Sequence, residues 1–460
     1  MTLRIQRLPY CKDSARLFES IRDLPWPVFL DSAYPMTSQG RYDILAADPT
    51  VRLVTRGEKT EIHTRNDSTV SSQDPLQLLY RYLAPGQKTS DTDLPFTGGA
   101  IGWFAYDLAR RFEKLPVLAE DTDGLPEMVI GIYDWAVVID HQAESSWLVG
   151  QGRDAATGEN WDRLVDELSR PSNVTSEPFH VTDIRSNLTE SAYYDSFQRI
   201  QGYIRDGDCY QVNFAQRFDA EVQGAPWEVY KRLRKVNPAP FCAYLESPYA
   251  AILSSSPERF LHLTGRHVET CPIKGTAPRH ENPGADRLSL VKLKNSEKDR
   301  AENLMIVDLL RNDIGKVCAT GSVEVSRLFE IESFARVHHL VSTVEGELAD
   351  GENALTLLRA CFPGGSITGA PKLRAMEIIE ELEPQRRGVY CGAIGYIGFN
   401  GDMDTNIAIR TLLQRGNTLQ FSAGGGIIAD STAEAEYQET YDKAAALFEL
   451  LKDPLTNHDQ

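Results

Sequence analysis

Apolar side chains recur at helical spacing in the second half of the chain. Phe197, Ile200 and Ile204 lie three and four positions apart after Thr189, and Gly207 can end the helix that they predict. Caps and apolar faces predict three further helices, over residues 296–311, 371–382 and 432–451. In the second of these, one apolar side is expected to carry Leu373, Met376, Ile379 and Leu382.

Strands are predicted where apolar residues run with little interruption. Residues 129–139 form one such run in the first half, and residues 389–399 and 419–428 form two more in the second. Strands and helices do not alternate regularly along the chain, so repeated βαβ units and a doubly wound fold are not favoured. The pattern predicts an α+β sandwich with mixed or antiparallel sheets.

A segment rich in proline, serine, asparagine and threonine separates the two halves. It covers residues 169–189 and has the composition of a linker. We therefore expect an N-terminal domain over residues 1–168, built from strands and turns with one or two helices. A second domain, which mixes strong helices with strands, is expected over residues 190–452.

The composition narrows the possible partners and the compartment. The chain has 460 residues and a net charge of −18, which argues against nonspecific binding to nucleic acid or to an anionic membrane. Its seven cysteines include no CxxC pair, which is typical of free thiols in a reducing compartment. The first residues lack the apolar core of a signal peptide, and no run approaches the ~20 apolar residues of a membrane span. The cytoplasm is the expected location.

A lysine and a glutamate suggest covalent chemistry. Lys274 lies between a β-like approach and a glycine, and Glu258 precedes it by sixteen residues. A lysine amine is a nucleophile only when neutral, and a carboxyl is a general acid only while protonated. If both face one cavity, the pair could displace a group on a small molecule. The alternative is a surface lysine after a strand and an exposed glutamate after a proline.

Acidic side chains on two predicted helices could hold a metal ion. Glu436, Glu439 and Lys443 are spaced to share one face of the last helix, and Asp299 and Glu302 lie three residues apart on another. Carboxylates from two helices can bind Mg²⁺ and leave coordination positions for a substrate carboxylate. The alternative is that acids in a first turn stabilise the helix dipole and face solvent.

Glycine, arginine and histidine complete the candidate binding groups. Gly424, Gly425 and Gly426 end a strand, and consecutive glycines let backbone N–H groups approach a carboxylate or a phosphate closely. Arg410 ends an alternating strand, where it could bind a carboxylate or form an ordinary salt bridge. His339 precedes an apolar strand, a position more typical of a hydrogen-bonded core histidine than of a catalyst.

Several long phrases together resemble the chorismate-binding enzymes. They follow the order of that family and cover residues 207–213, 256–260, 298–304, 311–315, 362–372 and 436–440. The resemblance extends over nearly the whole chain and is densest in the second half. It implies the anthranilate synthase component I-like fold, a large interleaved two-sheet sandwich with helices packed outside.

Residues 272–276 resemble the branch of the family that makes 4-amino-4-deoxychorismate for para-aminobenzoate and folate. The resemblance implies that Lys274 attacks C2 of chorismate while Glu258 protonates the departing C4 hydroxyl, and that ammonia then replaces the lysine. A separate glutamine amidotransferase subunit usually supplies the ammonia, so a heterodimer is expected. The alternative is anthranilate synthase component I of tryptophan biosynthesis, which aminates C2, eliminates pyruvate and usually carries alanine at this lysine position.

By the same resemblance, Mg²⁺ is the expected cofactor. Glu302 and Glu439 would hold it, with Glu436 contributing through water, and the ion would bind the ring carboxylate. The residues implied to bind or surround the substrate are Gln211, Gly275, Thr276, His339, Arg410, Gly424, Gly425, Gly426 and Lys443. Gln211 replaces a lysine that resembles a water-activating base in isochorismate and salicylate enzymes. Because glutamine takes no proton at neutral pH, water attack at C2 should be weak.

The first half of this family can also hold tryptophan. The matching residues here are Ser32, Gly40, Arg41, Tyr42, Pro240, Phe241 and Cys242. Asp31 departs from the glutamate that is common in the feedback-inhibited members. The alternative is that Ser32 and Tyr42 simply pack the sandwich.

Overall fold

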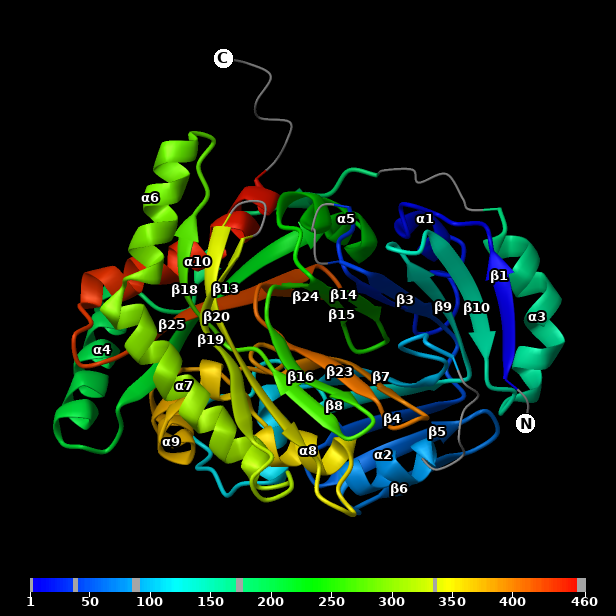
Figure 1. The fold of residues 1–460 in the computed structure, drawn as a ribbon, viewed down its shortest axis with the longest axis horizontal. Helices are drawn as coiled ribbons and strands as arrows, with labels where there is room; N and C mark the ends of the chain where they lie inside the picture. Colours follow the sequence, from blue (N-terminus) through cyan, green and yellow to red (C-terminus); the bar gives the residue numbers. More distant parts are fainter. Residues whose placement is uncertain (1–2, 36–39, 85–91, 171–176, 334–336, 453–460) are drawn as a thin grey trace.

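The fold was analysed in a computed structural model of the 460-residue chain. It describes residues 3–35, 40–84, 92–170, 177–333 and 337–452. Within these ranges the strands form two large sheets, and every strand pairing in them is antiparallel. The predicted α+β architecture of two interleaved sheets with helices packed outside is confirmed (Figure 1).

The first sheet has thirteen strands among the described residues. Its main path runs in the order β1 (Arg4–Leu8), β10 (Ser145–Gly150), β9 (Trp135–Asp140), β3 (Tyr42–Ala46), β2 (Val28–Asp31), β14 (Phe241–Glu246), β15 (Ala251–Ser256), β24 (Thr411–Arg415), β25 (Thr418–Ile427), β13 (Gln211–Gln223) and β11 (His180–Val181). Two short strands pair with β13 outside this path, and they are β12 (Arg185–Ser186) and β21 (Gly369–Ala370).

The second sheet has twelve strands in the same part of the chain. Its main path runs in the order β18 (Ile273–Pro278), β20 (Val337–Glu347), β17 (His267–Thr270), β16 (Arg259–Thr264), β23 (Met403–Ile407), β22 (Ala393–Gly398), β7 (Gly99–Phe104), β8 (Met128–Tyr133), β4 (Val51–Arg56), β5 (Lys59–Thr64) and β6 (Ser68–Ser71). β19 (Glu324–Ser333) pairs with β20.

Helices cover the outer faces and gather at the two ends of the molecule (Figure 1). Those at the end nearest β25 and β20 are α4 (Glu190–Arg205), α6 (Pro283–Lys294), α7 (Glu297–Gly315), α9 (Lys372–Leu382) and α10 (Ala433–Leu451). The others are α1 (Ala15–Phe18), α2 (Pro75–Leu83), α3 (Ala155–Leu168), α5 (Pro226–Val236), α8 (Ala354–Cys361) and the 3₁₀ turns η1 (Tyr106–Arg111) and η2 (Gly365–Ile367). None of the described helices is long and apolar enough to cross a membrane.

Both sheets combine strands from the two halves of the sequence. In the first sheet, β14 pairs with β2, and Cys242 faces Asp31. In the second, β22 pairs with β7, and Gly395 faces Gly102. The expected domains 1–168 and 190–452 therefore share their sheets, and the division between them stays a prediction. Of the expected linker 169–189, residues 171–176 lie outside the described residues, and the short strands β11 and β12 pair with β13.

The predicted helix starts are confirmed where a side chain caps the helix. The hydroxyls of Thr189, Ser296 and Thr432 each accept a backbone N–H at the start of α4, α7 and α10. Pro371 precedes α9 as its cap rather than lying in its first turn. Leu373 is 42% exposed, so the expectation that it shares the buried side of this helix was wrong.

The apolar run over residues 129–139 is two strands, not one. β8 belongs to the second sheet and β9 to the first, so the chain passes between the sheets at Asp134. All residues of both strands are buried, which explains the continuous apolar pattern. The expected strand over 389–399 is also shorter in the structure, because β22 begins only at Ala393.

Candidate active site

Lys274 lies in an irregular part of β18, where the pairing with β20 shifts register between Ile273 and Thr276. Gly275 has a φ of +84°, which favours glycine, and an added Cβ there would lie 2.9 Å from the side chain of Asp299 on α7. The bulge therefore brings the first turn of α7 against β18. Lys274 and Glu302, which were predicted to belong to one site, therefore come from two elements in contact, β18 and α7.

Ser366 connects the two residues that the sequence singles out for chemistry. It lies in the η2 turn, where its backbone oxygen accepts a hydrogen bond from Lys274 Nζ at 3.1 Å. Its hydroxyl donates to Glu258 Oε1 at 2.6 Å. The structure thus brings Lys274 and Glu258 to the same turn, as the paired interpretation requires. A surface lysine beside an exposed glutamate is excluded, because Glu258 is buried.

The surroundings of this pair move both pKa values toward each other. Burial raises the pKa of Glu258 above its ordinary value, although the Ser366 hydrogen bond and the Lys274 and Lys443 charges oppose the rise. Burial also lowers the pKa of Lys274, and the nearby Lys443 ammonium lowers it further. Both shifts favour the forms that react, which are a protonated acid and a neutral amine.

Glu302 of α7 and Glu439 of α10 lie near Lys274, and Glu436 lies near Glu439. Glu302 lies 3.9 Å from Lys298 Nζ, and burial raises its pKa. Burial also acts to raise the pKa of Glu439, but the charge and hydrogen bond of Lys443 at 2.6 Å bring it below its usual value. Burial raises the pKa of Glu436, whose Oε1 accepts from a serine hydroxyl at 2.6 Å.

The carboxylates leave acceptor capacity for a cation. Oε2 of Glu436 is buried and has no hydrogen-bond partner within the described part of the chain. An added Cβ at Gly425 would lie 2.8 Å from this atom and 3.2 Å from Glu439 Oε1, so glycine makes room for both side chains. No three His, Cys, Asp or Glu side chains of the described residues are already arranged as a metal site. The donor set fits Mg²⁺ chemically, since that ion prefers a few carboxylates and retains water ligands.

The glycines of β25 present backbone N–H groups at an open edge. Gly424 and Gly426 face Ala215 and Asn213 of β13, whose own N–H groups donate outside the ladder. In such non-hydrogen-bonded pairs, the N–H groups of both strands point away from the partner strand. β24 covers the other edge of β25 only up to Phe421 within the described ranges. Gly424 and Gly426 therefore direct N–H groups to this edge, where Lys443 Nζ also donates to the Gly424 carbonyl at 2.9 Å.

Arg410 is a candidate for binding an anion. Burial lowers the pKa of its guanidinium, and among the described residues it makes no salt bridge. Within the described ranges its guanidinium makes one hydrogen bond, a long contact of 3.4 Å to Asn237 Oδ1. The alternative interpretation of Arg410 as an ordinary salt bridge is wrong, because no acidic side chain of the described residues pairs with it. The charge of this partly buried arginine is therefore available to another partner.

His339 and Thr276 form one wall of the same region. Thr276 Oγ1 and His339 Nδ1 lie 2.8 Å apart, across the paired strands β18 and β20. Burial and the nearby Arg410 charge lower the pKa of His339 to about 3. The imidazole is therefore neutral near pH 7, and its role is to pack and to hydrogen-bond rather than to exchange protons.

Gln211 is a buried amide with unused hydrogen-bonding capacity. It is fully buried on β13, and neither polar atom of its side chain has a partner within the described residues. An added Cβ at Gly426 would lie 2.5 Å from Gln211 Nε2, so the side chain lies directly over the glycines of β25. A buried unpaired amide is costly, which makes a ligand or a water the natural partner.

Ser366 was missed in the sequence analysis. The phrase 362–372 was noted, but only as part of the resemblance to a family, and no role was assigned to its serine. The available signal was a hydroxyl between Gly365 and Ile367 in a phrase that matches over eleven residues. The contacts to Glu258 and Lys274 span 108 and 92 residues, so no local pattern could have identified them.

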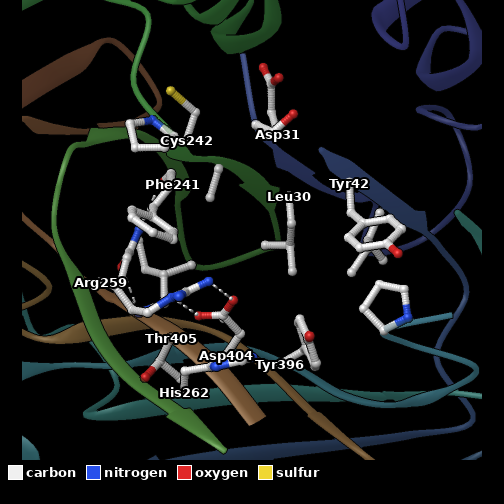
Figure 2. Close-up of a pocket in the computed structure, with 18 of the residues that line it drawn as sticks. Leu30, Asp31, Tyr42, Phe241, Cys242, Arg259, His262, Tyr396, Asp404 and Thr405 are labelled. Carbon is white, nitrogen blue, oxygen red and sulfur yellow. Dashed lines mark hydrogen bonds and ion pairs between the residues drawn. The ribbon is translucent and has the colours of Figure 1, made fainter. Parts of the chain in front are cut away.

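A cavity of about 450 Å³ lies between the two sheets (Figure 2). β2, β3 and β14 of the first sheet line one side, and β16, β22 and β23 of the second line the other. Of the residues expected to hold tryptophan, the structure brings six together here, namely Ser32, Arg41, Tyr42, Pro240, Phe241 and Cys242. Gly40 is buried but is not among the described residues that line the cavity.

The walls of this cavity carry apolar surface and paired charges. Figure 2 shows Tyr42 and Arg259 on opposite sides, with Arg259 bound to Asp404 at 3.0 Å. Ser32 donates through its backbone N–H and its hydroxyl to Asp43 Oδ1, both at 2.7 Å. Ser32 thus holds the wall together as well as lining it.

One peptide unit separates the two sites. Arg259 lines the cavity between the sheets, whereas the preceding residue, Glu258, is bound to Ser366. β16 begins at Arg259, and the pairing of this strand with β23 shifts register after it. The start of β16 and the residue before it therefore supply the two sites.

Comparisons with known proteins identify the family of this chain. The model of the chorismate binding enzyme family matches residues 32–449. The aminodeoxychorismate synthase component 1 of Salmonella typhimurium is 50% identical over 449 residues, which is 97% of each chain. The protein of the same name from Escherichia coli is 49% identical over 95% of each chain. In the solved structures, anthranilate synthase component I of Streptococcus pneumoniae has a TM-score of 0.80 and 34% identity, covering 88% of this chain and 91% of its own.

The family match covers most of the chain, and the two named relatives match almost end to end. Of the residues that the family resemblance singled out, Glu258, Glu302 and Glu439 all lie near Lys274 in the structure. This chain belongs to the family of chorismate-binding enzymes.

Proposed function

We propose that this chain is the chorismate-aminating component of an aminodeoxychorismate synthase. It converts chorismate and ammonia to 4-amino-4-deoxychorismate and water, for para-aminobenzoate and folate synthesis. The observation that carries the proposal is the Lys274–Ser366–Glu258 arrangement, in which a lysine and a buried acid share one turn. The names of the two relatives at 49% and 50% identity support the same activity.

The reaction divides into two displacements. The neutral amine of Lys274 forms a bond to C2 of chorismate, the double bonds shift around the ring, and the C4–O bond breaks. Glu258 gives its proton to the departing hydroxyl, which leaves as water. Ammonia then forms the C4–N bond, the double bonds shift back, and the C2–N bond to Lys274 breaks. The ether-linked enolpyruvyl group is kept throughout.

The remaining groups would bind and orient the substrate. Arg410 and the N–H groups of Gly424 and Gly426 suit its two carboxylates, because Arg410 offers a positive charge that, among the described residues, is held only by a long contact to Asn237, and the glycines offer N–H groups that point away from β13. Gln211 would fill its hydrogen bonds with the substrate and cannot activate water, which leaves the C2 face to Lys274. Gly275, Thr276 and His339 would form the opposite wall.

Mg²⁺ is the cofactor that the carboxylates would take. Glu302 and Glu439 would be its direct ligands, with Glu436 contributing through water, and the bound ion would supply positive charge to the ring carboxylate. Lysine ammonium groups lie against two of these carboxylates, Lys443 at 2.6 Å and Lys298 at 3.9 Å. The ion would therefore compete with internal salt bridges for its ligands.

The ammonia source would be a separate glutamine amidotransferase subunit, which makes the working enzyme a heterodimer. The component 1 in the names of the relatives supports a second component. We expect the complex in the cytoplasm. Amination at C2 with loss of pyruvate, as in anthranilate synthase, is the second candidate, and Lys274 argues against it because a covalent lysine occupies that carbon.

We also propose that the cavity between the two sheets binds tryptophan. It is large enough for an indole side chain, and its apolar walls carry charged pairs that could meet an ammonium and a carboxylate. Asp31 is already bound by Arg234 Nε at 2.8 Å and by the Tyr230 hydroxyl at 3.0 Å. This engagement favours a structural rather than an inhibitory role for the ligand.

Lys274→Ala should abolish most amination while chorismate still binds, because no amine remains to displace the hydroxyl. The purified chain, chorismate, Mg²⁺ and excess ammonium are incubated, and the product is identified by mass spectrometry. Lys292→Ala on α6, an exposed lysine, is the control and should keep full activity. Full activity of Lys274→Ala would remove the covalent step, and anthranilate plus pyruvate from the unmodified chain would select the second candidate.

The pH dependence of kcat/KM should be a plateau with two limbs. Reaction needs protonated Glu258 and neutral Lys274, so the acid limb breaks at the pKa of Glu258 and the alkaline limb at that of Lys274. The Lys443 charge lowers both pKa values, so Lys443→Gln should move both limbs to higher pH. Rates are measured at constant free ammonia, and unmoved limbs would show that these groups do not control the profile.

Glu436→Gln should weaken the Mg²⁺ dependence of chorismate binding, because one carboxylate charge near the ion is lost. Calorimetric titration with chorismate, with and without Mg²⁺, measures this without turnover. Glu434→Gln, an exposed acid in the first turn of the same helix, should behave like the unmodified chain. Equal Mg²⁺ dependence in both variants would argue against a metal at this helix.

L-Tryptophan should stabilise the folded chain and so raise its melting temperature. At a ligand concentration of a hundred times the Kd, the gain in the free energy of unfolding is about 2.7 kcal/mol. Ala243→Leu adds volume to the wall of the cavity and should remove most of this effect, because the ligand and the new side chain compete for space. D-Tryptophan is the control ligand. An unchanged response in Ala243→Leu would place the binding elsewhere.

A further inference from the structure

A buried ion pair lies behind the turn that carries Ser366. Glu383 follows the last turn of α9, and Arg387 comes four residues later. The guanidinium donates to both carboxylate oxygens, from Nε at 2.9 Å and from Nη2 at 2.6 Å. The two side chains are only 7% and 2% exposed, so this is not an ordinary surface pair on a helix end.

The remaining hydrogen bonds of the pair all go to backbone groups near the active site. Arg387 donates to the carbonyl of Ile367 at 2.8 Å and to that of Asn213 at 2.7 Å. Glu383 Oε1 accepts from the N–H of Ala215 at 2.9 Å. The pair thus joins the end of η2 to β13. Ile367 is the neighbour of Ser366, and Asn213 lies two residues after Gln211 on the same strand.

The surroundings leave the pair little freedom. The Arg387 guanidinium lies 4.8 Å from the ring of Tyr106 and 5.8 Å from that of Tyr390, so aromatic faces cover it. Replacing a buried ion pair by apolar residues is often neutral for stability, so such a pair is better explained by the geometry that it fixes. Here it fixes three backbone groups, none of which belongs to its own helix.

The turn held in this way carries both contacts of Ser366. Its carbonyl accepts from Lys274 Nζ at 3.1 Å and its hydroxyl donates to Glu258 Oε1 at 2.6 Å. A displacement of the turn would therefore move the nucleophile and the acid relative to each other. Misplacement of reacting groups by ~1 Å can lower a rate on the order of a hundredfold.

We propose that Glu383 and Arg387 are positioning residues for the amination: they hold the Ser366 turn against β13 and so fix where Glu258 and Lys274 lie relative to the substrate. This proposal rests on the proposed function for its kinetic consequence. It assigns no contact with substrate to either residue. Their effect passes through Ile367 and Ser366 on one side and through β13 and Gln211 on the other.

The chain contains a matched control on the same helix. Glu380 is as buried as Glu383, binds Arg110, and accepts from the N–H groups of Leu118 and Ala119 at 2.9 and 3.0 Å. These contacts lead to the segment after η1 and not to Ser366 or β13. Glu380→Gln and Glu383→Gln therefore remove the same charge from similar surroundings and differ in what each carboxylate holds.

Glu383→Gln should lower kcat on the order of a hundredfold, with the KM for chorismate changed less than about twofold. Glu380→Gln should keep kcat within about twofold of the unmodified chain, even if its melting temperature falls as much as that of Glu383→Gln. If Glu383→Gln is too unstable to study, the paired replacement Glu383→Leu with Arg387→Met restores an apolar core and should regain stability while kcat stays low. Activity that follows the melting temperature through all these variants would overturn the proposal.

A second readout needs no turnover. The rate at which an amine-reactive reagent modifies Lys274, followed by mass spectrometry without chorismate, reports the position of this side chain directly. A change in Glu383→Gln that is absent in Glu380→Gln supports the positioning role, and equal rates overturn it. If the unmodified chain forms no aminated product, the proposed function fails, and the modification rates still decide whether Glu383 and Arg387 position Lys274.

Discussion

The pairing of β7 with β22 joins the two halves of the second sheet. Gly102 and Gly395 face each other in this pairing, and each lies close to its other neighbouring strand. An added Cβ would lie 2.0 Å from the Val129 carbonyl oxygen of β8 at Gly102, and 2.1 Å from the Asp404 carbonyl oxygen of β23 at Gly395. No other residue type fits at either position without moving the backbone. From β22 the sheet continues through β23, β16, β17 and β20 to β18, the strand of Lys274. The nucleophile is thus placed by a pairing far from it in the sequence.

The sequence predicted best those features that depend on neighbours along the chain. The starts of α4, α7 and α10 follow from a hydroxyl at Thr189, Ser296 and Thr432 that caps nearby N–H groups, which is a local interaction. The passage of the chain from one sheet to the other at Asp134 could not be predicted, because every residue of β8 and of β9 is buried. Asp134 is the one charged residue in the run 129–139, but a single polar residue within a buried apolar run does not by itself indicate that the chain leaves one sheet for the other.

The candidate site was predictable only through phrases longer than a single motif. Lys274, Glu258 and the acids of α7 and α10 each had a plausible surface interpretation on spacing alone. Ser366 and the Glu383–Arg387 pair were not identified, because their roles lie in contacts across many residues. Glu383 and Arg387 have the spacing of an exposed salt bridge on a helix, and only their burial and their bonds to β13 and η2 separate them from one. Tertiary contacts of this kind leave no periodic trace in a sequence.

The adjacency of Glu258 and Arg259 limits how this protein can change. Glu258 directly precedes β16 and Arg259 begins it, so the carboxyl reaches Ser366 while the guanidinium lines the cavity between the sheets. Deletion of a single residue here would move at least one of these side chains away from its partners. Substitutions can be accepted one at a time at either site, but a change in length acts on both positions at once. The adjacency of Glu258 and Arg259 along the chain must therefore be kept, even where the side chains around them change.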